Sequence, residues 1–531
     1  MGTIADTSME NLNFCRQNTN VNMSEIQSFY NGSTVFLTGA TGFVGGLILE
    51  KLLRTCSGLK IIYVLIRDKK GETSETRFKD LFNNPLFDLM KKETPDYIDK
   101  VSVIIGDCEQ PNLGMKEHDR EILKSEVNII IHSAATVRFD EHLRKAIRIN
   151  IIALQDLLKI SQEIKQLKAF VHISTAYSNC ADRKIVEEKF YELPIFGHNL
   201  IQVVNSLSDE YVTSVTPSLL NKYPNTYVMT KAIAEGEILK YGKGLPVGVV
   251  RPSMIIATAN EPVRGWINNV YGPTGVVAAV YMGLMRIMCA DPKKYADLIP
   301  GDFVSNAVIV SAKDIHSQWK SHNMSESSSN TLSTNGGTFS PPIYNCVSTN
   351  TNPCTWKKFA EFNKKHLFSV PSTKTIFPIM IILTASKFHY NVIQFLVHIV
   401  PAFIIDSLAQ LTGKKPKLMD TYKKINNFVN VISYFSLRSW TFKDTNTTTM
   451  IAQMSDQDRK LFDFDISKLV WDDYFEHQVI GIRRYIINDP MDTAPKGLKH
   501  YKKLQNIYYT LLACVVAFLL LIGYGLFALF L

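Results

Sequence analysis

The sequence contains few cysteines, and they are not grouped. Eight cysteines occur among 531 residues, with no CxxC pair and no cluster of histidines beside them. Structural zinc sites and disulfide scaffolds both need cysteines at short, regular spacings. We therefore expect no bound metal and a chain that works in a reducing compartment. The cysteines are at positions 15, 56, 108, 180, 289, 346, 354 and 514.

The excess of positive charge is small and is spread along the chain. The sequence has 58 Lys and Arg residues against 49 Asp and Glu residues, a formal net charge of +9. It has no basic patch with interleaved aromatic residues, which argues against a nucleic-acid partner. Four lysines directly precede an apolar tail, and this placement favours a membrane surface. They are Lys496, Lys499, Lys502 and Lys503.

Long apolar runs are absent before the C-terminal end of the sequence. Residues 1–30 form a polar segment, so no secretory signal peptide is predicted. Residues 507–531 are an uncharged stretch of 25 residues, which at about 1.5 Å per residue exceeds the roughly 30 Å of bilayer hydrocarbon. We expect a single-pass C-terminal transmembrane helix in the endoplasmic reticulum, or alternatively the peroxisome, with the remaining chain in the cytosol. A buried helix of a soluble protein is the competing interpretation.

Two internal segments differ from an ordinary globular pattern. Residues 376–410 are apolar but are interrupted by Lys387, His398 and Asp406. We expect them to lie on or dip into the membrane interface, or to form a linker that packs as buried core. Residues 316–340 are rich in serine, threonine and asparagine, which predicts a mobile low-complexity insertion.

An apolar run at residues 35–37 leads directly into TGATGFVG at residues 38–45. Gly39 permits a tight turn, Gly42 leaves room for a pyrophosphate, and Gly45 lets the next helix pack closely with its amides toward the anion. This spacing indicates a dinucleotide site, and a glycine-rich turn without a ligand is the alternative. The cofactor residues expected in this loop are Thr38, Gly39, Thr41, Gly42, Phe43 and Gly45.

Further strands of the same sheet are predicted at residues 60–66, 101–105 and 127–131. Arg67 follows the first of them, where an NAD enzyme carries an acidic residue, and its planar guanidinium suits the 2′-phosphate of NADPH. A solvated charge run is the alternative. Asp107 is expected at the adenine edge, or else serves as a turn residue. Ala134, in HSAA after the third strand, is also expected to contact the cofactor.

A tyrosine and a lysine in YVMTK form the expected catalytic pair. Four residues of helix place Lys231 on the same face as Tyr227, where an ammonium group would lower the pKa of the phenol. A hydroxyl from Ser174 or Thr175, in HISTAYSN, would stabilise negative charge on a substrate oxygen. An ordinary amphipathic helix and strand end is the alternative. Tyr227 and Lys231 are also expected to contact the cofactor.

The order TGATGFVG, HSAATVRFDE, VHISTAYSNC, YVMTKAIAE and VVRPSMI resembles an extended short-chain dehydrogenase/reductase over residues 33–350. The motifs GWINNVYGPTG, CADPKKYADLIPGDFVSN and PPIYNCVS are similar to those of alcohol-forming fatty acyl-CoA reductases. Residues 419–488 resemble the small helical domain of that family. The resemblance implies an α/β fold with a Rossmann-type doubly wound parallel sheet. A mostly helical C-terminal domain and the transmembrane helix would follow it.

The resemblance also implies a division of the chain and an activity. A reductase domain would occupy residues 31–365 and the helical domain residues 415–490. The reaction would be NADPH-dependent reduction of long-chain or very-long-chain fatty acyl-CoA to a primary fatty alcohol and CoA, through a bound aldehyde. Tyr227, Lys231 and either Ser174 or Thr175 occupy the family's catalytic positions. The alcohol would serve wax, ether-lipid, hydrocarbon or pheromone-type synthesis.

Alternative functions share part of this pattern. A membrane-bound short-chain reductase acting on a sterol or another lipid would carry the same glycine loop and YxxxK pair, but would not explain residues 419–488. A reductase that stops at the aldehyde, and a scaffold that binds NADPH or lipid without catalysis, are the others. The expected partners are fatty acyl-CoA and the lipid bilayer, with a homodimer as a candidate assembly. Cys180 is expected to be a small buried side chain and not an acyl acceptor.

Overall fold

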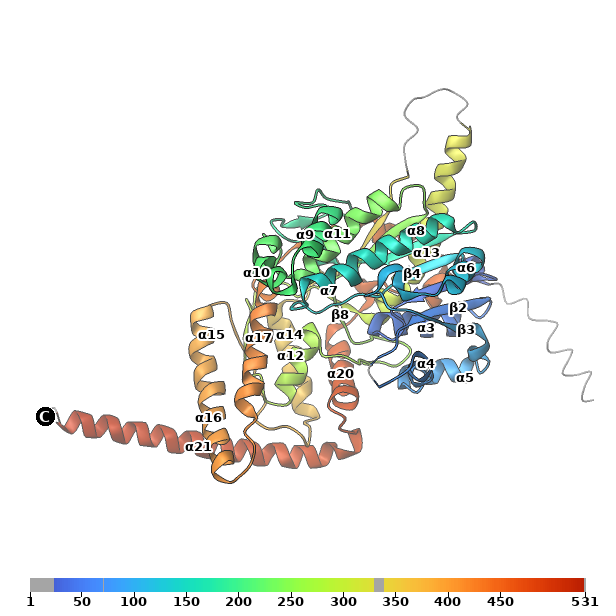
Figure 1. Ribbon diagram of the computed structural model, residues 1–531. Coiled ribbons are helices and arrows are strands. Elements are labelled where there is room, and N and C mark those ends of the chain that lie inside the picture. Colours follow the sequence, from blue (N-terminus) through green and yellow to red (C-terminus); the bar gives the residue numbers. More distant parts are fainter. Residues whose placement is uncertain (1–22, 70, 329–338, 530–531) are drawn as a thin grey trace, which may run out of the picture.

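The centre of the protein is a seven-stranded parallel sheet, in the order β11-β7-β5-β4-β1-β2-β3 (Figure 1). The computed structural model describes residues 23–69, 71–328 and 339–529. All five residues of β1 are buried, as expected for a parallel sheet covered on both faces. The predicted doubly wound sheet is therefore confirmed. Its strands are β1 (Thr34–Thr38), β2 (Ile61–Ile66), β3 (Val101–Ile105), β4 (Ile129–His132), β5 (Ala169–Ile173), β7 (Val247–Pro252) and β11 (Ile343–Cys346).

Helices cover both faces of the sheet. On one face α3 (Phe43–Thr55) packs against α13 (Gly301–Ser328), and on the other α8 (Ala153–Glu163) packs against α11 (Thr226–Tyr241). The chain runs outward from β1 to β2 and β3, and then returns to place β4 on the other side of β1. This reversal opens a crevice at the carboxyl ends of the strands, where α/β proteins bind ligands.

Further helices and six short strands complete the described part of the fold. The other helices are α2 (Glu25–Tyr30), α4 (Ser74–Leu81), α5 (Asp88–Glu93), α6 (Glu117–Glu126), α7 (Leu143–Ile147), α9 (Gly197–Ser206), α10 (Asp209–Leu220), α12 (Gly272–Tyr281), α14 (Trp356–Ser369), α15 (Lys387–Gln394), α16 (Val400–Leu411), α17 (Leu418–Ser436), α18 (Thr445–Gln453), α19 (Asp456–Leu461), α20 (Trp471–Gly481) and α21 (Ala494–Leu529). The short strands are β6 (Ile185–Val186), β8 (Met254–Ile256), β9 (Ile287–Cys289), β10 (Leu298–Pro300), β12 (Ile382–Thr384) and β13 (Thr441–Phe442).

The C-terminal region is mostly helical, as predicted, and it packs tightly against the part of the chain that carries the sheet. β13 pairs with β6. The indole of Trp440 donates a hydrogen bond of 2.9 Å to the backbone carbonyl of Cys180. Phe475 on α20 packs edge-on against Phe359 on α14, with ring centroids 5.6 Å apart. Residues from both regions therefore share one apolar core.

Two helices in the described part of the chain are long and apolar enough to cross a membrane. One covers Met491–Gly525, and its most apolar 18 residues have a mean hydropathy of 2.2; the other covers Lys387–Leu411, where the corresponding value is 1.9. The first contains most of the apolar tail predicted to span. In the second, the interruptions noted in the sequence do not break the helix, because a π-helical turn at Phe395–Ile399 joins α15 to α16.

The structure adds to one expectation about the sequence and corrects another. Residues 25–30, at the end of the polar N-terminal segment, form helix α2, where Ile26 and Tyr30 are buried and the Tyr30 hydroxyl donates to the Ile309 carbonyl at 3.0 Å. The first part of the 316–340 insertion, expected to be a mobile loop, continues α13 through Ser328. Trp319 there packs edge-on against Phe339. Residues 329–338 lie outside the described part of the structure.

Candidate active site

The turn after β1 has the geometry that its glycines predict. Gly39 has a φ of +79°, and a Cβ there would lie 2.7 Å from the backbone nitrogen of Ala134. A Cβ on Gly45 would collide with the carbonyl of Gly39. Helix α3 begins at Phe43, with Gly42 as an N-cap that has no side chain to satisfy the first amides. These free amides and the space left by the glycines fit the pyrophosphate of a dinucleotide.

Thr38 does not reach the crevice, although we expected it to contact the cofactor. Its side chain is fully buried, and its Oγ1 lies 2.8 Å from Nδ1 of His132. The same oxygen accepts a hydrogen bond of 3.2 Å from the amide of Ala134. Thr38 therefore joins the ends of β1 and β4 and supports the Ala134 backbone behind the glycine turn. Burial lowers the pKa of His132 to about 3, so its ring is neutral.

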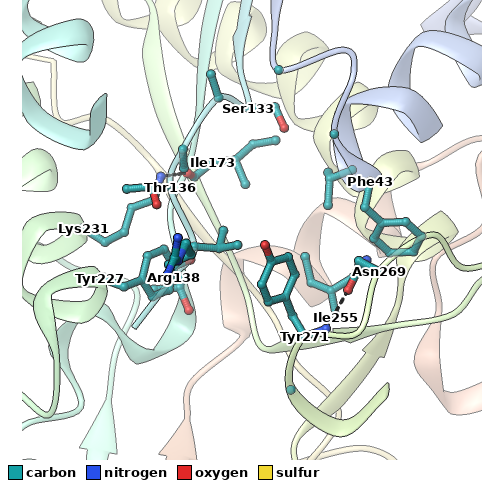
Figure 2. Close-up of a pocket in the computed structure, with 18 of the residues that line it drawn as sticks. Phe43, Ser133, Thr136, Arg138, Ile173, Tyr227, Lys231, Ile255, Asn269 and Tyr271 are labelled. Atoms are coloured by element: carbon teal, nitrogen blue, oxygen red, sulfur yellow. Dashed lines mark hydrogen bonds between the residues drawn. The ribbon is translucent and has the colours of Figure 1, made fainter. Parts of the chain in front are cut away.

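A cavity of about 800 Å³ opens above the carboxyl ends of the strands. It runs from the glycine turn past the ends of β2 and β3 to α11 and the C-terminal helices. Figure 2 shows Tyr227 and Lys231 on one side of it and Tyr271 and Ile255 across from them. The predicted residues that line the cavity are Gly39, Thr41, Gly42, Phe43, Gly45, Arg67, Asp107, Ala134, Ser174, Thr175, Tyr227 and Lys231.

Two arginines lie at the end of the cavity beyond β2. Arg67 is 46% exposed, and its Nη1 lies 3.4 Å from a carboxylate oxygen of Asp107. Arg77 on α4 donates to the backbone carbonyl of Arg67 and lies 3.5 Å from the Thr41 hydroxyl. The sequence predicted Arg67. It gave no signal for Arg77, because a single arginine in an amphipathic helix is ordinary.

Tyr227 and Thr175 lie together on the cavity wall. Burial raises the pKa of Tyr227 to about 12, and hydrogen bonding with the Thr175 side chain opposes this shift. We expected Lys231 to lower the pKa of this phenol. Instead its Nζ donates a hydrogen bond of 2.7 Å to the Ile173 carbonyl, so burial dominates at Tyr227. Burial also lowers the pKa of Lys231 to about 8, an effect that Glu235 opposes.

Ser174, adjacent to Thr175, faces a buried polar network. Its hydroxyl donates to Oε1 of Glu235 at 2.5 Å. The Arg251 guanidinium binds both carboxylate oxygens of Glu235, at 2.9 and 2.6 Å. Glu235 and Arg251 are almost completely buried. They lie within YVMTKAIAE and VVRPSMI, but sequence reasoning assigned no role to either residue.

The other end of the cavity is apolar. Its side chains come from β8, α12, β9 and the C-terminal half of α17, and they line the part of the cavity next to Tyr227. These residues are Met254, Ile255, Val276, Met288, Ile432 and Phe435.

The cysteines and acidic side chains suggest no other chemistry. Burial at Cys180, behind the cavity wall that carries Tyr227, raises the pKa of its thiol to about 12, which suits the expected packing role and not a thiolate nucleophile. Among the residues the structure describes, no group of His, Cys, Asp and Glu side chains could hold a metal ion.

Known proteins match this chain over most of its length. Fatty acyl-CoA reductase wat of Drosophila melanogaster is 38% identical over 508 residues, which cover 96% of this chain and 94% of that protein. Fatty acyl-CoA reductase 1 of Xenopus laevis is 36% identical, covering 92% of this chain and 91% of that protein. The human fatty acyl-CoA reductase 1 is 35% identical over the same shares.

Solved structures with the same fold are more distant in sequence. The terminal R domain from the myxalamid PKS-NRPS biosynthetic pathway has a TM-score of 0.54 and 17% identity, covering 87% of this chain and 93% of that one. The reductase (R) domain of a nonribosomal peptide synthetase from Mycobacterium tuberculosis has a TM-score of 0.51 and 18% identity, covering 88% and 96%. These similarities establish the fold.

The parallel sheet and the glycine turn are those of the short-chain dehydrogenase/reductase type, and the relatives and the NAD-binding family model identify the chain as an oxidoreductase with a nicotinamide cofactor. Two models described as "Male sterility protein" match the chain, an NAD-binding one at residues 37–308 and the Sterile domain at residues 397–489. Together with the relatives, they establish that the chain belongs to the fatty acyl-CoA reductase family.

Proposed function

We propose that the protein reduces long-chain or very-long-chain fatty acyl-CoA to a primary alcohol with NADPH. The observation that carries this proposal is the continuity of one cavity. It joins the glycine turn, where a dinucleotide would bind, to the apolar end of the cavity, which we call the apolar chamber. Tyr227 and Thr175 lie between the two. In the balanced reaction, one thioester, two NADPH and two protons give one alcohol, two NADP⁺ and free CoA. NADPH supplies a hydride in each of two successive reductions.

NADPH is preferred over NADH in this proposal because of the charge at one end of the cavity. Arg67 and Arg77 come from different elements and converge beside the glycine turn. A guanidinium binds phosphate through parallel hydrogen bonds. These two side chains would hold the 2′-phosphate, whereas the 2′-hydroxyl of NADH would leave both without that partner.

Tyr227 would donate a proton, and Thr175 would stabilise the substrate oxygen. A phenol with a pKa of about 12 stays protonated at neutral pH, so it can give a proton to an oxygen that becomes negative as hydride arrives. The Thr175 hydroxyl beside it would donate a hydrogen bond to the same oxygen. Lys231 would hold positive charge near this oxygen and near the cofactor ribose.

The two reductions would occur at the same position. Collapse of the first adduct breaks the carbon–sulfur bond, releases CoA and leaves an aldehyde. The apolar chamber would keep the acyl chain in place, so that the aldehyde carbon remains beside Tyr227 and Thr175 for the second reduction. No acyl-enzyme is needed, which accords with the raised pKa of the Cys180 thiol.

A membrane-anchored arrangement completes the proposal. A reductase domain at residues 31–365 and a helical domain at residues 415–490 would lie in the cytosol, anchored by residues 507–531. The lysines before this anchor support the orientation. The endoplasmic reticulum is the proposed membrane, and the peroxisome is the alternative compartment.

The deciding experiment incubates membranes that carry the protein with NADPH and a series of acyl-CoAs of increasing chain length. Alcohol, aldehyde, CoA and NADPH are measured together. Two NADPH consumed for each CoA released, with alcohol as product, would support the four-electron reduction. Accumulated aldehyde would limit the activity to the first step. If no acyl-CoA in the series led to consumption of NADPH, the proposal would be overturned, and a sterol substrate or a non-catalytic scaffold would be examined next.

A further inference from the structure

The helix over Lys387–Leu411 has two chemically different faces. Tyr390, His398, Ala402 and Asp406 are buried at intervals of one or two turns. The opposite face is apolar, and each of its large side chains is at least 43% exposed. A continuous exposed apolar face of this kind marks a surface that binds a partner or a membrane. We call it the apolar face, and it consists of Phe388, Val392, Phe395, Leu396, Phe403, Ile404, Leu408 and Leu411.

Specific polar contacts fix the orientation of this helix against α17. The Tyr390 hydroxyl donates to Asn426 at 3.2 Å. The His398 ring stacks on Tyr422 with centroids 4.7 Å apart. The Asp406 carboxylate accepts hydrogen bonds of 2.8 to 3.1 Å from the first amides of α17, those of residues 417–419. The apolar face therefore points outward because the polar face is bonded to the protein.

The direction of α21 identifies what covers the apolar face. None of the most apolar stretch of Met491–Gly525 is buried in the protein. Figure 1 shows α15 and α16 along one outer side of the molecule, and α21 runs in a different direction, past the end of α16 and away from the body. Two helices that run in different directions cannot both follow the bilayer normal. If α21 spans, Lys387–Leu411 lies along the membrane surface.

Lysines at both ends of this helix fit a phospholipid surface. Lys387 begins the helix, and Lys414, Lys415 and Lys417 follow its last turn. All four side chains are exposed. Basic residues that flank an apolar face bind anionic headgroups while the apolar side chains enter the acyl region. The charge pattern thus favours a lipid bilayer over a second protein as the occupant.

Helix α17 connects this surface to the cavity. Its first half carries Tyr422 and Asn426, which contact the surface helix. Its second half carries Ile432 and Phe435, which line the apolar chamber. A second connection runs through β12, which ends three residues before the helix and pairs with β9, the strand that carries Met288 of the chamber.

We propose that Lys387–Leu411 lies in the membrane surface with its apolar face among the lipid chains, and that acyl chains pass from the bilayer beside this face, along α17, into the cavity. The first part, on membrane contact, is independent of the enzyme activity. The second part rests on the proposed function.

Depth measurements on the full-length protein test the first part. Single cysteines at the apolar face would carry a nitrobenzoxadiazole label, in a chain where Cys15, Cys108 and Cys514 are serine. The protein would be reconstituted into phosphatidylcholine and phosphatidylserine vesicles that contain quenchers attached near the headgroup or near the end of the acyl chain. The labelled variants are Phe388→Cys, Phe395→Cys, Phe403→Cys and Leu411→Cys, and Phe196→Cys, at an exposed position of the reductase region, is the control.

A helix in the membrane surface predicts the same shallow depth at all four positions and no quenching at the control. A depth that increases toward the middle of the helix would overturn the proposal in favour of a second span. Absence of quenching at the four positions would overturn it as well, since water or protein would then cover the face.

Rates with two substrates test the second part. The triple variant Phe395→Ser/Phe403→Ser/Leu408→Ser is compared with the equally exposed control Ile185→Ser/Phe196→Ser/Val470→Ser. We expect the apolar-face variant to reduce a long-chain acyl-CoA bound to vesicles about tenfold more slowly than the unmodified protein. Its rate with a short-chain acyl-CoA in solution should be unchanged. An unchanged long-chain rate would overturn the delivery route. If the unmodified protein reduced no acyl-CoA, the proposed function would fail while the depth result still stood.

Discussion

The hydroxyls of Ser174 and Thr175 are directed to different partners. Ser174 donates to the buried carboxylate of Glu235 at 2.5 Å, whereas the Thr175 hydroxyl lies at the cavity wall beside Tyr227 and donates to the Pro252 carbonyl at 3.4 Å. The sequence alone left these two hydroxyls as equal candidates. Their different surroundings make them separable by experiment.

Thr175→Val should lower turnover by about 10²–10³-fold, because it removes a donor to the developing oxyanion without a change in shape. Ser174→Ala should keep most of the turnover and instead lower the free energy of unfolding by about 1–3 kcal/mol. Steady-state rates and urea denaturation of the two variants check this assignment. The reverse pattern would make Ser174 the catalytic hydroxyl.

Tyr227→Phe should lower turnover by about 10²–10⁴-fold with little change in the affinity for NADPH, since only the proton donor is lost. The measurements are alcohol formation and a fluorescence titration with NADPH. Tyr223→Phe, on a neighbouring tyrosine that is absent from the cavity lining, is the control. Undiminished alcohol formation by the Tyr227 variant would refute its proposed role.

Arg67→Ala and Arg77→Ala should each raise the KM for NADPH by about tenfold or more, the effect of one lost charge-assisted hydrogen bond. The KM for NADH should change little, because NADH carries no 2′-phosphate. Lys79→Ala is the matched control, since Lys79 is an exposed cation on the same helix. Equal effects on both cofactors would show that the arginines have no selective role.

The value of kcat/KM should fall as the pH rises through about 8, because the buried Lys231 loses its proton near that pH. Tyr227 has a pKa of about 12, so its ionisation should not contribute to the pH dependence of kcat/KM near neutral pH. Lys231→Arg keeps its charge, so any residual activity should lack the alkaline decline. A wild-type profile that stays flat well above pH 8 would contradict this role for Lys231.

Glu235→Gln should lower the free energy of unfolding by about 3–5 kcal/mol, because it leaves the Arg251 guanidinium buried without its counter-charge. Glu187→Gln breaks an exposed pair with Lys189 and should leave thermal stability nearly unchanged. Thermal melts of both variants provide the comparison. Equal melting temperatures would mean that the buried pair contributes little to stability.

Features with a local cause were predictable from the sequence. The glycine spacing fixes how closely backbone atoms can approach, so the turn after β1 and the strands around it were predicted correctly. Arg77, Glu235 and Arg251 were missed, because their roles depend on which distant segments meet them in the folded chain. The pKa of Tyr227 was misjudged for the same reason. Helical spacing brought Lys231 to the correct face, but it could not indicate that its ammonium group would donate a hydrogen bond to the Ile173 carbonyl.

The loop expected over the first part of residues 316–340 was wrong for a different physical reason. The composition of a segment limits how much apolar surface it can bury, and this segment has few apolar side chains. The helix that precedes it is nevertheless firmly packed, and extending an existing helix costs far less than starting one. α13 therefore continues through Ser328.

The wall that α17 supplies to the cavity has a consequence for how such enzymes diversify. Ile432 and Phe435 lie some two hundred residues beyond Tyr227 and far from the glycine turn in the chain. Under the proposed function, part of the wall that meets the acyl chain comes from a segment of the chain remote from the one that performs the chemistry. Mutations in α17 can alter which chain lengths are accepted while hydride transfer is preserved, so selection can act on one property with little penalty to the other.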